Sequence, residues 1–265
     1  MEIIEFIGYI GALFIGLVLG LIGGGGSILT VPILVYALSF NPVIATAYSL
    51  FVVGSTSLVG AIKNMSKGRV DFKTAIVFAI PAFTVIYLTR AYLIPSIPDV
   101  LFYIGDIVVT KELSIMLFFA VVMLLASIAM IRNKDQQIDT TTKRINYPML
   151  ISQGLFIGLI TGMIGAGGGF LIIPSLVLLA KLPMKRAVAT SLFIISINSL
   201  IGFLGDIQTY TIDWPFLIVF TGISIVGIFI GIWLNKFVDG KKLKKAFGWF
   251  VLIMGFYIIY KEFTL

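Results

Sequence analysis

The sequence predicts an all-α polytopic membrane protein made of two inverted repeats of about five hydrophobic segments each. Three observations predict this class: the composition, a series of apolar runs, and a self-similarity at one fixed offset. Of the 265 residues, 59% are hydrophobic and 12% are charged, and the mean hydropathy is +1.11. Soluble domains contain about 45–50% apolar and about 25% charged residues. The composition therefore excludes a soluble globular domain.

Apolar runs follow one another along the chain, and a membrane span needs about 20 mostly apolar residues. In the first half they cover residues 3–22, 27–40, 43–62, 72–94 and 112–131. In the second half they cover residues 148–164, 170–182, 187–205, 214–235 and 246–261. We expect an N-terminal repeat at 1–131, a polar cytoplasmic linker at 132–146 and a C-terminal repeat at 147–265.

The two halves match each other at an offset of 142 residues. Between positions 16 and 60 this offset gives 19 identities in 45 positions without a gap. The identities include a Gly cluster, Pro32 with Pro174, and Ser49 with Ser191. Low complexity does not align such residues at a single offset, so the pattern indicates a duplication.

Loop charges indicate that the second repeat is inverted. The connection after the third run is basic in the first half, whereas its counterpart in the second half holds no Lys or Arg. The connection after the fourth run shows the opposite bias. Because Lys and Arg collect in cytoplasmic loops, equivalent loops are expected on opposite sides of the cell (cytoplasmic or inner) membrane. This places the linker inside and both termini outside.

Each half is expected to contain a Gly-rich broken or re-entrant helical hairpin. The second run of each half is short, and a Gly cluster precedes it. Non-helical backbone at membrane depth is tolerated inside protein or along a water-filled cavity. The helix N-termini that follow favour anions. We expect these turns to bind substrate, with plain tight turns as the alternative; the residues are Gly24, Gly25, Gly26, Ser27, Gly167, Gly168 and Gly169.

Polar side chains in the third run of each half are candidates to complete this site. Hydroxyl and amide groups can donate to an oxyanion without burying a charge. The alternative is hydrogen bonding between helices or to the helix backbone. The candidates are Thr46, Ser49, Thr190, Ser191 and Asn198.

Few charged residues fall within the runs. Asp71 and Asp213 open the two fourth runs and are expected to be helix N-caps, with a coupling-ion role as the alternative. Arg90 is expected to snorkel to the outer interface. Asp206 is expected in an outer loop.

No enzyme motif is present in the chain. It lacks HExxH and GxSxG, and its Gly runs lack the Lys-Ser/Thr of a phosphate-binding loop. With no His and no Cys, most zinc sites are excluded. We therefore expect no catalysis, no metal and no cofactor. The net charge of +7 is expected from cytoplasmic loops rather than from nucleic-acid binding. The expected partners are a lipid bilayer and a small anion, and the sequence carries no signal of oligomeric state.

The duplicated GLxxGxIGxGGG…P element, in which Ser27 replaces the last Gly of the first copy, is followed in both halves by AxAxSLF. With the Asp that opens each fourth run, these elements resemble the sulfite exporter TauE/SafE family, also called the toluene sulfonate uptake permease family. The resemblance covers essentially the whole chain. It implies a transporter of small sulfur-containing anions, of the sulfite, sulfonate or sulfoacetate class.

Export by alternating access is the expected mechanism. A membrane potential that is negative inside drives a monovalent anion outward with about 2.3 kcal/mol per 100 mV, so export needs no coupling ion. The alternatives are a passive anion channel or facilitator and a proton-coupled importer. A non-transporting membrane scaffold is the alternative from a different class.

Overall fold

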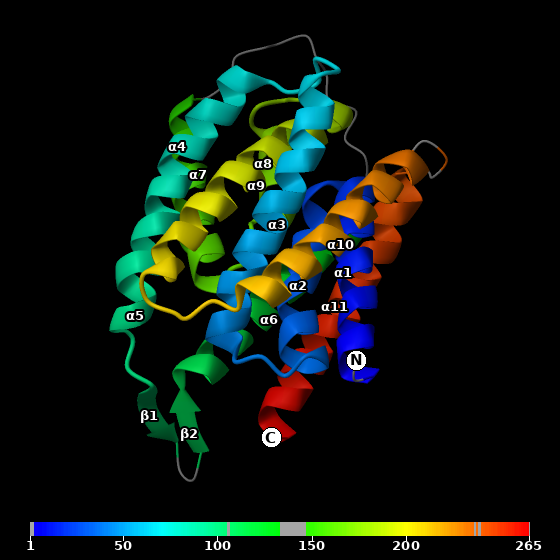
Figure 1. Ribbon diagram of the computed structural model, residues 1–265. Coiled ribbons are helices and arrows are strands. Elements are labelled where there is room, and N and C mark those ends of the chain that lie inside the picture. The colour runs from blue at the N-terminus through cyan, green and yellow to red at the C-terminus, as the bar shows by residue number, and fades with distance from the viewer. Residues whose placement is uncertain (1–2, 105–106, 133–146, 236, 238–239, 265) are drawn as a thin grey trace.

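A computed structural model describes residues 3–104, 107–132, 147–235, 237 and 240–264 (Figure 1). Within these residues the chain is almost entirely helical. Seven of the described helices are long and apolar enough to cross a membrane. This confirms the predicted all-α polytopic membrane class. The predicted linker falls mainly on residues 133–146, which lie outside the described residues.

The first half begins with α1 (Ile3–Ile22), a 3₁₀ turn η1 (Gly24–Gly26), α2 (Ser27–Pro32) and a π-helical continuation η2 (Ile33–Ala37). It continues with α3 (Pro42–Met65), α4 (Phe72–Leu88), a π-helical segment η3 (Thr89–Leu93), α5 (Ile94–Ser96) and α6 (Lys111–Arg132). The second half contains α7 (Tyr147–Ile164), α8 (Gly169–Leu178), α9 (Met184–Ile207), α10 (Trp214–Leu234) and α11 (Gly240–Thr264). These helices fall close to the predicted apolar runs.

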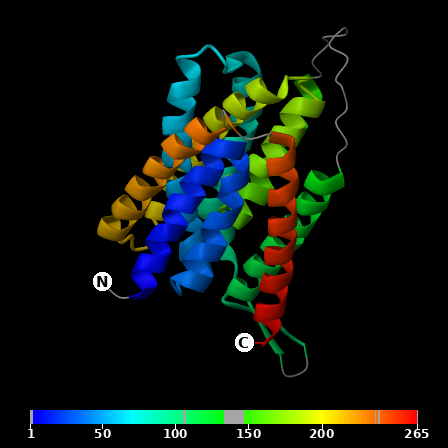
Figure 2. The same cartoon turned by 90° about the vertical axis from the view of Figure 1, so that its right-hand side faces the viewer.

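A short β-hairpin joins α5 to α6, where the sequence analysis expected no strand. Strand β1 (Val100–Ile104) pairs antiparallel with β2 (Ile107–Thr110). The segment is rich in β-branched and aromatic residues around a Gly-Asp pair, which is a hairpin pattern. In Figures 1 and 2 this hairpin lies toward the same end of the molecule as the starts of α1 and α3; we call this the hairpin end. The α3–α4 and α8–α9 connections lie at the opposite end, which we call the basic end.

The Gly turns divide helical hairpins. Helix α1 packs beside α2 and η2, and the chain reverses at the turn between them (Figure 2). The returning leg, Ser27–Ala37, is a short apolar helix of about 17 Å at 1.5 Å per residue. A bilayer core is about 30 Å thick, so this leg does not cross it alone. Helices α7 and α8 contact each other across the equivalent turn.

Helix packing repeats between the two halves. Helix α1 packs on α10 while α7 packs on α4, and α3 and α9 pack against each other in the middle. The close contacts follow the same rule: Gly16 lies against Ser224, and Gly158 lies against Ala82. Gly16 and Gly158 are 142 positions apart, and so are their partners Ala82 and Ser224. Figure 1 shows α3 and α9 running in opposite directions.

Glycines set the distance between α1 and α10. A Cβ atom at Gly227 would overlap the carbonyl oxygen of Leu13, whereas a Cβ atom at Gly222 on the same helix would meet nothing within 4 Å. Such small-residue contacts allow membrane helices to approach closely.

We predict that Gly227→Ala destabilises the protein by about 1–3 kcal/mol, the usual effect of overpacking. The matched control Gly222→Ala should stay within about 0.5 kcal/mol of the wild type. Thermal unfolding in one detergent measures both variants. Equal stability of the two variants would contradict this packing.

Candidate functional site

The two Gly turns meet at the middle of the molecule. A Cβ atom on Gly24 would overlap the backbone of Gly169, and a Cβ atom on Gly169 would overlap that of Gly24. Only glycine allows this approach. Gly167 and Gly168 also have φ angles of +65° and +68°, which other residues rarely adopt. The halves therefore touch backbone to backbone at their turns.

Two hydroxyl groups flank the second turn. A Cβ atom at Gly167 would lie 2.9 Å from Ser199 Oγ, and one at Gly168 would overlap Thr161 Oγ1. Ser199 is fully buried and Thr161 is 2% exposed, yet neither hydroxyl has a hydrogen-bond partner among the described residues. Leaving a buried polar group unpaired costs about 1–3 kcal/mol. Both hydroxyls therefore keep a hydrogen-bonding capacity that the described residues do not use.

The same turn is followed by the N-terminus of α8. The first N–H groups of a helix have no partner within it, and they carry its positive dipole end. No side chain caps this end, and the N-cap is Gly168. Backbone donors and the two hydroxyls thus gather at one glycine turn. The sequence prediction included the turn but missed Thr161. Ser199 was recognised as one of the polar residues of its run, matched by Ser57 in the repeat, but was not chosen as a candidate.

Two of the predicted polar residues are buried with an atom that has no partner. Ser49 is fully buried and Asn198 is 1% exposed. Ser49 Oγ and Asn198 Oδ1 have no hydrogen-bond partner among the residues that the structure describes. Both lie on the crossing helices α3 and α9.

Other predicted residues make local hydrogen bonds. Ser27 Oγ donates to the Gly24 carbonyl at 2.8 Å, and Ser191 Oγ donates to the Val188 carbonyl at 2.9 Å. Thr190 Oγ1 accepts from the backbone N–H of Asp71 at 3.0 Å.

The remaining glycines of the first cluster belong to η1. A Cβ atom at Gly26 would lie 2.6 Å from the backbone nitrogen of Leu19, so this glycine serves close packing against α1. The surroundings of Gly25 lie outside what the structure describes.

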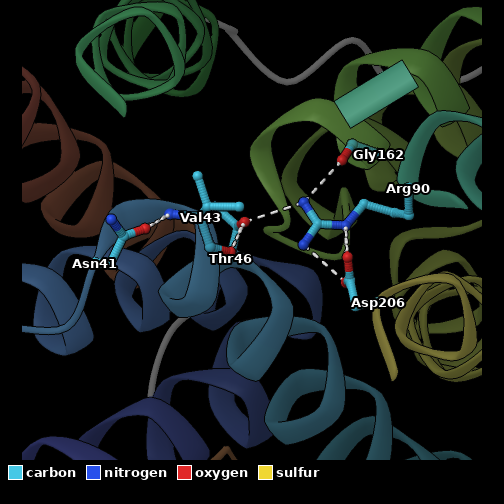
Figure 3. A network of polar contacts seen from close by, with 6 residues as sticks. All are labelled: Asn41, Val43, Thr46, Arg90, Gly162 and Asp206. Atoms are coloured by element: carbon cyan, nitrogen blue, oxygen red, sulfur yellow. Dashed lines mark hydrogen bonds and ion pairs between the residues drawn. The ribbon is translucent and has the colours of Figure 1, made fainter. Parts of the chain in front are cut away.

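Arg90 is fully buried, so the prediction that it snorkels to the interface is wrong. Its Nε donates to Oδ1 and Oδ2 of Asp206 at 2.9 and 2.8 Å, and its Nη2 lies 2.7 Å from Oδ2 (Figure 3). Its Nη1 donates to Thr46 Oγ1 at 3.0 Å and to the Gly162 carbonyl at 3.3 Å. The side chain lies in the π-helical segment η3, whose wider turn changes the direction of the residues that follow α4.

Asp206 also differs from its prediction, because it lies in the last turn of α9 and not in an outer loop. Helix α9 extends past the predicted end of its run, and the carboxylate is fully buried. A buried charge is tolerated when it is paired, and each of these two residues supplies the partner that the other needs.

Thr46 connects this ion pair to the second Gly turn. Its Oγ1 accepts from Arg90 and donates to the Val43 carbonyl at 2.7 Å (Figure 3). A Cβ atom at Gly165 would overlap Thr46. Thr46 therefore lies between the guanidinium group of Arg90 and the turn, and it contacts both.

Asp71 and Asp213 are helix N-caps, as expected. Their side chains accept from the N–H groups of Thr74 and Phe216 at 3.0 and 3.1 Å. Among the described residues, no group of three His, Cys, Asp or Glu side chains is placed to hold a metal ion.

The family model of the sulfite exporter TauE/SafE matches residues 9–258. The chain belongs to the sulfite exporter TauE/SafE family. The match includes both Gly turns, Arg90 and Asp206, so the site described above lies inside the family region. Together with the seven apolar helices, family membership shows that this TauE/SafE protein is a multi-pass membrane transporter.

Curated relatives of this TauE/SafE protein carry similar names. A "Probable membrane transporter protein" of Xylella fastidiosa (strain 9a5c) is 28% identical over 258 residues, which cover 94% of this chain and 93% of that protein. "Probable membrane transporter protein YunE" of Bacillus subtilis (strain 168) is 26% identical, over 94% of this chain and 95% of that protein. "Probable membrane transporter protein MJ0441" of Methanocaldococcus jannaschii is 36% identical over 117 residues, 42% of this chain and 44% of that protein. No solved structure matches this chain.

The capping geometry predicts how the two aspartates respond to substitution. Asn caps a helix as well as Asp does, so Asp71→Asn and Asp213→Asn should retain stability, whereas Asp71→Ala and Asp213→Ala should each lose about 0.5–2 kcal/mol. Thermal unfolding of the purified transporter measures the difference. Asn variants as unstable as the Ala variants would contradict the capping role.

Proposed function

We propose that this TauE/SafE protein transports small sulfur-containing anions, of the sulfite, sulfonate or sulfoacetate class, and exports them by alternating access. The observation that carries the proposal is the second Gly turn, where the N-terminus of α8 and the unpartnered hydroxyls of Thr161 and Ser199 converge. The family description, sulfite exporter, supports the substrate class.

The donors at this turn suit such anions. Sulfite and sulfonate groups each present three oxygens to hydrogen-bond donors. Backbone N–H groups at a helix N-terminus hold anions without a full positive charge, so binding stays weak enough for release. Glycine at 167 and 168 lets the backbone of the turn approach the hydroxyls of Ser199 and Thr161 closely. Ser49 and Asn198, each with a buried oxygen that has no partner within the described part of the chain, are proposed to complete the site from α3 and α9.

We also propose that residues 1–131 and 147–265 form the predicted inverted repeats. The packing of equivalent glycines at one offset and the opposite directions of α3 and α9 support this arrangement. The basic end carries the Lys- and Arg-rich connections, so it is assigned to the cytoplasm and the hairpin end to the outside. The halves would then rock about the Gly24–Gly169 contact, in the cell's cytoplasmic membrane.

Transport assays test the proposal directly. Proteoliposomes should move sulfite and methanesulfonate when a membrane potential is imposed without a pH gradient, because about 2.3 kcal/mol per 100 mV already drives the anion. Flux should saturate with substrate concentration. A requirement for a pH gradient would favour a proton-coupled importer, with Asp71 and Asp213 as candidate coupling residues. Flux that does not saturate would favour a channel, and the absence of sulfur-anion flux would contradict the substrate.

The hydroxyls give a sharper test of the site. Thr161→Val and Ser199→Ala should each lower methanesulfonate flux about tenfold or more, since a hydrogen bond to a charged group contributes about 1.5–3 kcal/mol. Thermal stability should remain that of the wild type, because neither hydroxyl has a hydrogen bond to a described residue that the substitution would remove. Ser152→Ala is the matched control on α7: Ser152 is exposed, and its Oγ donates to the Met149 carbonyl of its own helix. Full flux in the two buried variants would contradict the assignment.

A further inference from the structure

Resting on the proposed function, we infer that Arg90 is a second anion-binding residue, between the central turn and the hairpin end. Whenever no anion is bound to Arg90, the Asp206 carboxylate takes the place of the transported oxyanion at its guanidinium group. The anion leaving the turn exchanges with the Asp206 carboxylate, and the returning carboxylate releases it.

The geometry of the ion pair supports exchange. Asp206 presents two oxygens to the Nε and Nη2 edge of the guanidinium, at 2.7–2.9 Å. Sulfite and sulfonate offer two oxygens in a similar spacing, and guanidinium groups bind carboxylates and tetrahedral oxyanions with the same planar fork. The carboxylate and the anion therefore compete for one edge.

The other donors of Arg90 do not offer a second pair of N–H groups that could bind an anion at two oxygens. Nη1 is already used by Thr46 and Gly162. Nη2 contacts Oδ2 of Asp206 and has no other partner among the described residues, so one of its N–H groups can receive an incoming anion first. Complete binding then requires Asp206 to leave.

Asp206 lies next to an exposed turn at the end of α9. It lies one residue before the end of α9, and Ile207, Gln208 and Thr209 are all exposed. The carboxylate displaced from the buried pair is inferred to move toward this exposed turn at the hairpin end. A charge displaced into water avoids the cost of a lone buried ion.

Packing does not account for the pair. At the offset of 142, the positions equivalent to Arg90 and Asp206 are Ile232 and Asn64. The equivalent helices α10 and α3 pack together without an ion pair at these positions. Since apolar residues of similar volume can often replace a buried ion pair without loss of stability, a role in anion binding is consistent with the presence of these charges at this end alone.

Substitution of Asp206 separates exchange from a structural role. In detergent, Asp206→Asn should bind methanesulfonate at least tenfold more tightly than the wild type by titration calorimetry, because its competitor is gone. Its methanesulfonate flux in proteoliposomes should fall at least tenfold, because the anion is no longer displaced. A purely structural pair predicts unchanged or weaker binding.

A double variant avoids leaving one buried charge without a partner, which could prevent folding. Arg90→Met with Asp206→Leu removes both charges, keeps the volume, and should retain thermal stability while losing at least tenfold in flux. Normal flux in this double variant, or unchanged affinity in Asp206→Asn, overturns this inference alone, provided that the wild type transports methanesulfonate. Absence of binding and flux in the wild type overturns the proposed function together with it.

Discussion

The contact between Gly24 and Gly169 is the constraint on which the rest of the structure depends. Because neither residue has a side chain, the turns of the two halves meet backbone to backbone, and α3 and α9 cross beside them. This contact places the N-terminus of α8 in the interior, away from lipid. Irregular backbone at such depth is stable only where protein or a ligand satisfies its polar groups. The open N–H groups and hydroxyls at this turn thus follow from the way the halves meet.

A symmetric framework carries one asymmetric chemical group. Contacts between helices repeat at a fixed offset, down to single glycines and the two capping aspartates. Arg90 and Asp206 have no charged counterparts at that offset. Neutral donors lie at the central turn, whereas a paired full charge lies on one side of it. The two directions of movement therefore meet different electrostatics, which suits a transporter that favours one direction.

Much of the helical fold was predictable from local pattern, because the length of the apolar runs indicates the spans. The caps at Asp71 and Asp213 were also predictable, since Asp before an apolar run is a strong N-terminal signal. The buried position of Arg90 was not, because it depends on the π-helical turn η3 and on a partner 116 residues away. Thr161 and Ser199 stand out only in the structure, where both hydroxyls are buried beside the same turn with no hydrogen-bond partner among the described residues.

The chain has no Cys, so one introduced thiol reports on the central turn without background. The most direct measurement is maleimide labelling of Ser199→Cys in proteoliposomes, with increasing methanesulfonate. A substrate site at the turn predicts that methanesulfonate protects the thiol over the same concentration range in which the reduced flux of this Ser199→Cys variant saturates, while chloride does not. Labelling that methanesulfonate leaves unchanged, in protein that still transports it, would show that the anion passes elsewhere and would contradict the account.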